Sequence, residues 1–172
     1  MKKVITLFAA VVMIASFSNT VLADGGATAT ATSSATIVAP ITIVKATDMN
    51  FGNVAVNSAV GGGTVVLIPA GTRTTTGTVT LPTTAGTVSA ASFTIGGTGT
   101  YSYIITLPTT CTLTSGANTM TVGTFTSTPS ATGALTAGAQ TLLVGATLTV
   151  AASQATGVYV SGTAFNVTVN YN

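Results

Sequence analysis

Threonine is the most frequent residue of this chain, and with Val, Ile and regularly placed Gly it favours short extended strands joined by tight turns. The sequence has 172 residues and carries 37 threonines between Thr28 and Thr168. Residues branched at Cβ favour strands. Apolar and polar residues alternate with a period of two, and Gly or Pro interrupts the alternation about every eight to twelve residues. No stretch keeps the period of an amphipathic helix, so the pattern predicts an all-β protein.

We expect a single domain over residues 36–172, an antiparallel β-sandwich of immunoglobulin-like type. Whether the sandwich is complete or lacks a strand stays open at this point. The alternation predicts nine strands: Thr36–Lys45, Met49–Ala55, Thr64–Ile68, Thr76–Leu81, Val88–Ile95, Tyr101–Leu107, Thr119–Thr126, Thr141–Val150 and Val158–Tyr171. No fixed repeat of roughly 20 to 50 residues is present, which argues against a solenoid.

The first residues have the pattern of a signal peptide. A short positive segment with Lys2 and Lys3 precedes an apolar run from Val4 to Phe17, and small residues stand before a cleavage site after Ala23. The apolar run is shorter than the roughly 20 residues that a membrane span needs. We therefore expect residues 1–23 to be removed, no membrane span to remain, and the protein to pass through the periplasm to the cell surface.

Charged side chains are so rare that most chemistry is excluded. They make up 3% of the chain, which has no His and one Cys, Cys111. Without His or a second Cys, the chain cannot build a nitrogen or sulfur metal centre. A nucleophilic Ser or Cys would have no imidazole base, and Asp24 and Asp48 are the only carboxylate side chains. We expect no catalytic, metal-binding or cofactor-binding residues, and no enzyme activity.

The same charge count bears on partners. Lys45 and Arg73 are the only basic residues after the leader, too few for the positive field that nucleic-acid binding requires. They balance Asp24 and Asp48, so the processed chain has no net charge. A neutral surface opposes association only weakly. Self-association is therefore expected, and a nucleic-acid partner is not.

The segment after the leader alternates like one face of a long strand. Apolar or small residues occupy every odd position from Ala27 to Ile43, and Thr or Ser fills most even positions. For residues 24–35, two interpretations stay open: a disordered terminus, or an arm that adds a strand to the sheet of another copy. The donor positions of such an arm are Ala27, Ala29, Ala31, Ala35 and Ile37.

The C-terminus also ends on an alternating strand. Its apolar positions are Phe165, Val167, Val169 and Tyr171. No charge lies near it to blunt an exposed edge, and such edges pair readily with other chains. The alternative is an internal strand that is paired on both sides.

The magnitude of side-chain burial separates the weak arm positions from the strong one. Each buried methyl group contributes about 0.8 kcal/mol, whereas ordering the backbone costs about 1–2 kcal/mol per residue. Alanine methyls alone therefore cannot hold a durable assembly. We predict that Ile37→Asp harms assembly more than Ala29→Asp.

Other side chains suggest a surface-binding module instead. Tyr101, Tyr103 and Tyr159 could line a carbohydrate groove, although pairing in a core or across strands is the commoner fate of tyrosine. Thr-x-Thr runs suggest ice binding, but their irregular spacing along the chain argues against a ranked array. Cys111, with no cation near it in sequence, is expected to be a buried, inert thiol.

Several segments together resemble the domain-of-unknown-function 4402 family of secreted bacterial proteins. They are Pro40–Ile43, Asp48–Gly52, Tyr101–Pro108, Asn118–Val122, Leu143–Leu148 and Phe165–Asn172. The resemblance implies export from a Gram-negative type of cell and no known enzyme activity.

More distantly, the chain resembles archaic chaperone–usher pilins of the spore-coat-U-like type. That resemblance implies an incomplete immunoglobulin-like sandwich with an N-terminal arm at 27–37, and a terminal strand with Tyr171 as the penultimate residue. It also implies a periplasmic chaperone and an outer-membrane usher as partners. Two features depart from the pilin pattern: a lone Cys111 cannot form a disulfide within the chain, and the arm begins with Ala rather than with bulky residues.

The sequence therefore predicts an exported structural subunit of a bacterial surface fibre or extracellular matrix, assembled by strand addition between copies. The alternative is a monomeric secreted module that binds carbohydrate or ice.

Overall fold

The computed structural model describes residues 26–56 and 61–172. It divides between Thr36 and Ile37 into two units. Residues 26–36 have no regular secondary structure, and each of them is exposed. The second unit, Ile37–Asn172, holds all the described strands, and we call it the β-domain. The predicted signal peptide lies outside the described residues.

The β-domain is all-β. Its strands are β1 (Thr42–Thr47), β2 (Ala55–Val56), β3 (Gly63–Leu67), β4 (Arg73–Gly77), β5 (Val79–Thr80), β6 (Ala91–Gly96), β7 (Ser102–Thr106), β8 (Thr110–Ser115), β9 (Asn118–Thr128), β10 (Thr132–Ala134), β11 (Ala139–Val150), β12 (Val160–Ser161) and β13 (Thr168–Tyr171). All their pairings are antiparallel. The prediction of an antiparallel, sandwich-like β fold is confirmed. No helix in the described residues is long and apolar enough to cross a membrane.

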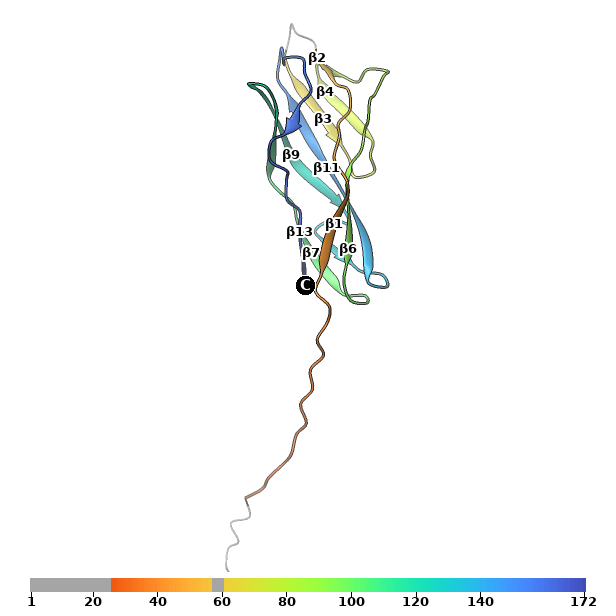
Figure 1. Cartoon of the computed structure of the whole chain (residues 1–172), viewed down its shortest axis with the longest axis vertical. Coiled ribbons are helices and arrows are strands. Elements are labelled where there is room, and N and C mark those ends of the chain that lie inside the picture. The colour runs from red at the N-terminus through yellow and green to blue at the C-terminus, as the bar shows by residue number, and fades with distance from the viewer. Residues whose placement is uncertain (1–25, 57–60) are drawn as a thin grey trace, which may run out of the picture. The chain divides into compact units, whose positions relative to one another are not determined.

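One eight-stranded sheet forms the larger layer. Its main order is β1-β6-β11-β9-β8-β12, and β3 and β4 join it through β11. The long strands β9 and β11 pair with each other over most of their length (Figure 1). On the other side of β11, its first half pairs with β6 and its second half pairs with β3. A three-stranded sheet, β10-β7-β13, and the short pair β2-β5 are the other sheets.

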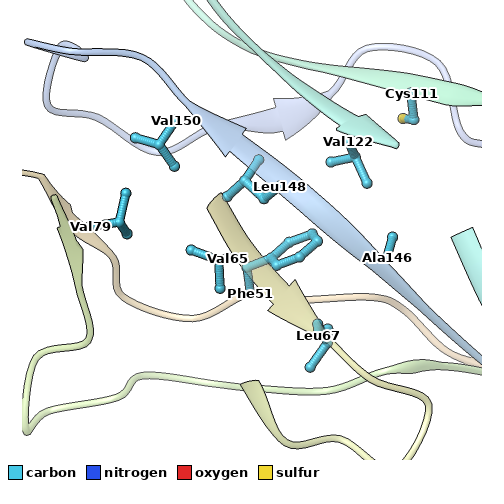
Figure 2. Packing of buried hydrophobic residues seen from close by; sticks show 9 residues of the cluster. All are labelled: Phe51, Val65, Leu67, Val79, Cys111, Val122, Ala146, Leu148 and Val150. Atoms are coloured by element: carbon cyan, nitrogen blue, oxygen red, sulfur yellow. The ribbon is translucent and has the colours of Figure 1, made fainter. Parts of the chain in front are cut away.

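The inner side chains of β11 belong to two separate cores. Leu142 and Val144 lie in the first core, whose buried members are Ala91, Ile95, Tyr103, Ile105, Leu135, Leu142, Val144 and Val169. Ala146, Leu148 and Val150 lie in the second core, with Phe51, Val65, Leu67, Val79, Cys111 and Val122 (Figure 2). We call them the Tyr103 core and the Phe51 core.

Four predicted strands are wrong at their ends or in their continuity, each for a local reason. The first begins at Thr42 instead of Thr36, because Pro40 has no N–H to donate to a ladder. Thr76–Leu81 is divided between β4 and β5, because Gly77 has a φ of 69°. Met49–Ala55 is irregular except for the Asn50–Ser89 bridge and Ala55, the first residue of β2.

The predicted C-terminal strand Val158–Tyr171 is also divided. Only Val160–Ser161 and Thr168–Tyr171 are paired, so Phe165 and Val167 lie outside β13. Thr168 pairs opposite Thr106, the last residue of β7. Pro108 follows shortly after and cannot donate to a ladder. The partner strand therefore ends where the pairing of β13 begins.

Candidate functional site

A groove of about 1010 Å³ opens over the Phe51 core. Residues 45–56, which include the end of β1, form its first wall, and residues 153–161 with 164–165 form its second wall. Protein interiors are packed with few voids larger than a water molecule. An opening of this size is therefore a gap in the layer that covers the large sheet, and not a packing defect.

The floor of the groove comes from the large sheet. Inner side chains of β8, β9 and β11 line it: Cys111, Leu113, Met120, Val122, Leu148 and Val150. Leu113 and Met120 are only half-buried, as are Met49 and Phe165 in the walls. These large apolar side chains pack on the edge of the Phe51 core without being fully covered. Covering them would remove apolar surface from water, at about 25 cal/mol per Å².

Arg73 fixes the first wall. Its guanidinium donates hydrogen bonds to the carbonyl oxygens of Phe51, of Asn53 at 2.9 Å and of Ala85 at 3.4 Å. The side chain of Asn50 accepts a hydrogen bond from the Gly52 N–H at 2.8 Å. The carbonyl groups of Phe51 and Asn53 are thus satisfied by a side chain rather than by a neighbouring strand.

The second wall is held by fewer contacts. Gln154 donates to the carbonyl of Thr119 at 3.2 Å and to the hydroxyl of Tyr159 at 2.8 Å. Val160 and Ser161 form β12, which pairs with β8 over two residues. Val158 and Val160 in this wall are exposed. The wall therefore offers apolar side chains that the described part of the β-domain leaves largely uncovered.

The groove is close to neutral. Lys45 and Asp48 are the charged residues that line it, and their side chains form an exposed ion pair with a distance of 2.7 Å from Nζ to Oδ1. The described residues contain no cluster of His, Cys, Asp or Glu able to hold a metal ion. The groove therefore suits an uncharged, largely apolar occupant.

Cys111 lies where the floor meets the second wall. It is 9% exposed, and its Sγ lies 3.8 Å from the Thr163 carbonyl oxygen. Burial raises the pKa of the Cys111 thiol, so little thiolate forms at neutral pH. The expected burial of this thiol is confirmed.

Strands β1 and β13, at the two ends of the domain's sequence, each pair with one of the described strands. Strand β1 pairs with β6, and β13 pairs with β7. The two strands approach each other without pairing. The alternative of an internal C-terminal strand is therefore wrong. The first wall follows β1, and the second wall precedes β13, so the groove separates the first and last parts of the domain.

The predicted donor positions lie at the start of the described chain. The side chains of Ala27, Ala29, Ala31 and Ala35 are exposed, and Ile37 is 97% exposed. Of the predicted C-terminal set, Phe165 lines the groove, Val169 is buried, and Val167 and Tyr171 are half-buried. Sequence reasoning placed Phe165 in a terminal strand and missed its place in a groove wall.

A second surface lies on the outer face of the large sheet. The register places five threonines in one row across five strands: Thr76, Thr64, Thr149, Thr121 and Thr112. Leu148 and Val150 point into the core, so Thr149 points outward. A neighbouring row holds Thr74, Thr147 and Thr110. The spacing that is irregular along the chain becomes regular across the strands.

The three tyrosines considered for carbohydrate binding do not gather at one site. Tyr103 is fully buried and donates to the Gln140 side chain at 2.6 Å. The Tyr159 hydroxyl is bound to Gln154 and to the Ala155 carbonyl. The ring of Tyr101, half exposed, packs at 5.6 Å against that of Tyr171.

Comparison with known proteins gave one match. The model of the family described as "Domain of unknown function (DUF4402)" matches residues 41–171. No curated protein and no solved structure was found to match the chain. The match spans the β-domain from the residue before β1 to the end of β13, and it covers well over half of the sequence. The chain therefore belongs to the DUF4402 family.

Proposed function

We propose that this protein is an exported structural subunit of a bacterial surface fibre or extracellular matrix. In this assembly, residues 27–37 of one copy enter the groove of the next copy as an added strand. The groove is the observation that carries the proposal, because half-buried apolar side chains line a gap between the first and last parts of the fold. The protein acts as a binding and building element, without enzymatic activity.

The chemistry of the arm matches that of the groove. Residues 27–37 carry no charge, and the charged pair Lys45–Asp48 in the groove is internally neutral. An uncharged arm is therefore compatible with a nearly neutral, largely apolar groove. Extended at roughly 3.3 Å per residue, the arm would span about 36 Å.

The arm gains affinity from two sources. The alternate Ala methyls contribute little, about 0.8 kcal/mol each. Ile37 is 97% exposed, and its burial contributes about 1.5–3 kcal/mol. Backbone hydrogen bonds to an added strand supply the remaining gain.

Export and assembly partners complete the proposal. The leader directs the chain to the periplasm, and the unfilled groove would expose apolar surface until a sister copy arrives. A periplasmic chaperone that covers the groove, and an outer-membrane usher that passes subunits outward, would meet this need. Support for these two partners comes from the sequence resemblance to archaic pilins.

A comparison of boiled and unboiled samples on a denaturing gel tests the proposal. Strand-linked polymers resist detergent and give a ladder that collapses to one band on heating. Ile37→Asp should shorten the ladder strongly, because it loses the large side-chain burial of Ile37 in addition to the desolvation cost of a carboxylate in an apolar groove. Ala29→Asp, the matched control, should shorten it less. A single unheated monomer band, or equal effects of the two changes, would contradict the proposal.

An ice-binding face is the second candidate function, favoured by the row of five threonines. Each threonine carries a hydroxyl and a methyl group, and neighbouring strands repeat about every 4.8 Å. That repeat is close to one repeat of oxygen atoms on the faces of ice. No charged side chain belongs to the two threonine rows.

Ice-recrystallisation inhibition distinguishes this second function. Thr149→Lys, in the middle of the row, should abolish inhibition because its longer charged side chain prevents close contact. Thr94→Lys lies on β6, outside the row, and should leave inhibition unchanged. Absence of inhibition by the unaltered protein, or equal losses in both variants, would eliminate this candidate.

A further inference from the structure

Three hydrogen bonds join Ala39, Thr98 and Tyr171 in a closed ring, which we call the clasp. The Ala39 N–H donates to Thr98 Oγ1 at 2.9 Å. The Thr98 N–H donates to the Tyr171 hydroxyl at 2.8 Å, which in turn donates to the Ala39 carbonyl oxygen at 3.0 Å. The clasp therefore binds three distant segments: the chain before β1, the β6–β7 loop and the end of β13.

Neighbouring residues make room for the clasp and stiffen it. A side chain at Gly97 would collide with the Tyr171 hydroxyl and with Leu135, so glycine is required for the hydroxyl to enter. The Tyr171 ring packs against Tyr101 with a centroid distance of 5.6 Å. Pro40 follows Ala39 and restricts the backbone through its ring. Both backbone groups of Ala39 are thus held, although its side chain is exposed.

The clasp lies next to the strongest donor position. Ile37 is two residues before Ala39 and is 97% exposed. A segment that is ordered before docking loses less conformational entropy when it binds. Holding Ala39 therefore removes part of the cost of burying Ile37 in another copy.

We propose that Tyr171 is a positioning residue for strand donation: its hydroxyl, through the clasp, fixes Ala39 and so presents Ile37 to the groove of the next copy. This inference rests on the proposed function. The clasp acts in the copy that donates its arm, and it lies apart from the groove, whose lining does not include Ala39, Thr98 or Tyr171. Donation and acceptance should therefore respond differently to a change at Tyr171.

A capture experiment separates the two roles. The chain with Ile37→Asp, whose own arm is disabled, is immobilised as acceptor, and the full chain is supplied at low concentration as donor. Tyr171→Phe in the donor removes both hydrogen bonds of the hydroxyl and should weaken capture about fivefold, the factor expected for the loss of its bond to Ala39. The same change in the acceptor should leave the capture of unaltered donor unchanged. A purely structural role would lower both by similar factors.

Two controls complete the design. Tyr101→Phe in the donor makes the same chemical change on the adjacent ring, whose hydroxyl forms no hydrogen bond within the described residues, and it should have no effect. A synthetic peptide of residues 27–37 should bind equally well to the acceptor with Tyr171 and to the acceptor with Tyr171→Phe. Suppose that donor and peptide both bind, but that Tyr171→Phe has no effect in the donor or has the same effect in donor and acceptor. That result would overturn the clasp proposal and leave the proposed function standing. If neither the donor nor the peptide binds, the proposed function fails with it.

Discussion

The two cores share strand β11 but are covered in different ways. Over the Tyr103 core, the three-stranded sheet β10-β7-β13 packs across the first half of β11 (Figure 1). Over the Phe51 core, the second half of β11 is covered by irregular segments and by the two-residue strands β2 and β5. The floor of the groove comes from the second core, and the groove reaches the first core at Ala91 and Phe93. The first core is covered by regular strands, whereas the second leaves large apolar side chains half-buried along the groove.

The difference follows from where backbone partners are available. The layer over the Phe51 core contains Gly52 with a φ of 66°, and two of its carbonyl groups accept hydrogen bonds from the Arg73 side chain. The layer over the Tyr103 core contains the regular strand β7, which pairs with β10 on one side and β13 on the other. A sheet face covered by regular strands has its apolar side chains buried, whereas a face covered by loops keeps some of them half exposed.

Truncation of one leucine in each core should produce the largest contrast. Leu142→Ala in the Tyr103 core should lower the free energy of unfolding by about 3–4 kcal/mol, because the cavity cannot collapse. Leu148→Ala borders the groove and should cost about 2 kcal/mol, since its surroundings can relax into the opening. Urea denaturation of the two variants measures both values. A larger loss for Leu148→Ala would show that the Phe51 core is the better packed of the two.

Two glycines on neighbouring strands provide the next contrast. A Cβ at Gly145 of β11 would collide with the backbone of Leu67–Pro69, at the point where β11 passes from one core to the other. Gly145→Ala should therefore cost about 2–3 kcal/mol. A Cβ at Gly123 of β9 would meet atoms at ordinary distances of 3.5 Å or more, so Gly123→Ala should change stability by less than about 0.5 kcal/mol. Similar melting temperatures for the two variants would refute this account of the crossing.

Loss of the Arg73 guanidinium should affect the groove wall alone. Arg73→Met leaves the carbonyls of Phe51 and Asn53 without a donor and should cost about 2 kcal/mol. Hydrogen exchange should rise in residues 50–55 and not in β7. Lys45→Met, which removes the exposed partner of Asp48, should cost less than about 0.5 kcal/mol. If exchange in the wall of Arg73→Met stays slow, another contact must fix that wall.

High pH should weaken the Tyr103 core with the smallest effect of the series. Burial raises the pKa of the Tyr103 hydroxyl in the folded chain, while the unfolded chain releases this proton near pH 10. The stability it contributes is complete below about pH 10 and falls as pH rises from there toward the folded pKa. Tyr103→Phe should therefore be less stable than the unaltered chain at pH 7, and the difference should shrink above pH 10. A constant difference across this range in urea titrations would contradict the assignment.

Regular alternation identified most of the strands that form the two cores. The predicted strands Thr64–Ile68, Tyr101–Leu107 and Thr141–Val150 correspond closely to β3, β7 and β11. Each of these strands has one buried face, so apolar residues alternate with polar ones along it and the pattern can be recognised in the sequence. β8 and β10 were not among the predicted strands, although β8 falls in the Thr-rich run around Cys111.

The groove and the threonine row could not be predicted, because both arise from pairing between distant segments. Phe165 alternates like a strand residue, yet its position in the second wall follows from β7 ending at Thr106. Thr64, Thr149 and Thr112 are unevenly spaced along the chain, and only the register of β3, β11, β9 and β8 aligns them. From the sequence, Arg73 entered only the count of charged residues. Its hydrogen bond to Asn53, 20 residues earlier, depends on the turns that lie between the two residues.

A cysteine scan of the arm tests the central claim most directly, because Cys111 is the only cysteine of the chain and lies in the groove floor. Single changes of Ala27, Ala29, Ala31 and Ala35 to Cys are compared with the same change at Thr28, Thr30, Thr32 and Thr36, after mild oxidation of the full chain. Disulfides need Cβ atoms about 3.5–4.5 Å apart. Same-face positions of an extended strand lie about 6.6 Å apart, so only one arm position can face Cys111 closely enough. We predict a disulfide between copies at one position of the alanine series, seen as a ladder on non-reducing gels, and none in the threonine series. Disulfides that form within one copy, or none at any position, would contradict the account.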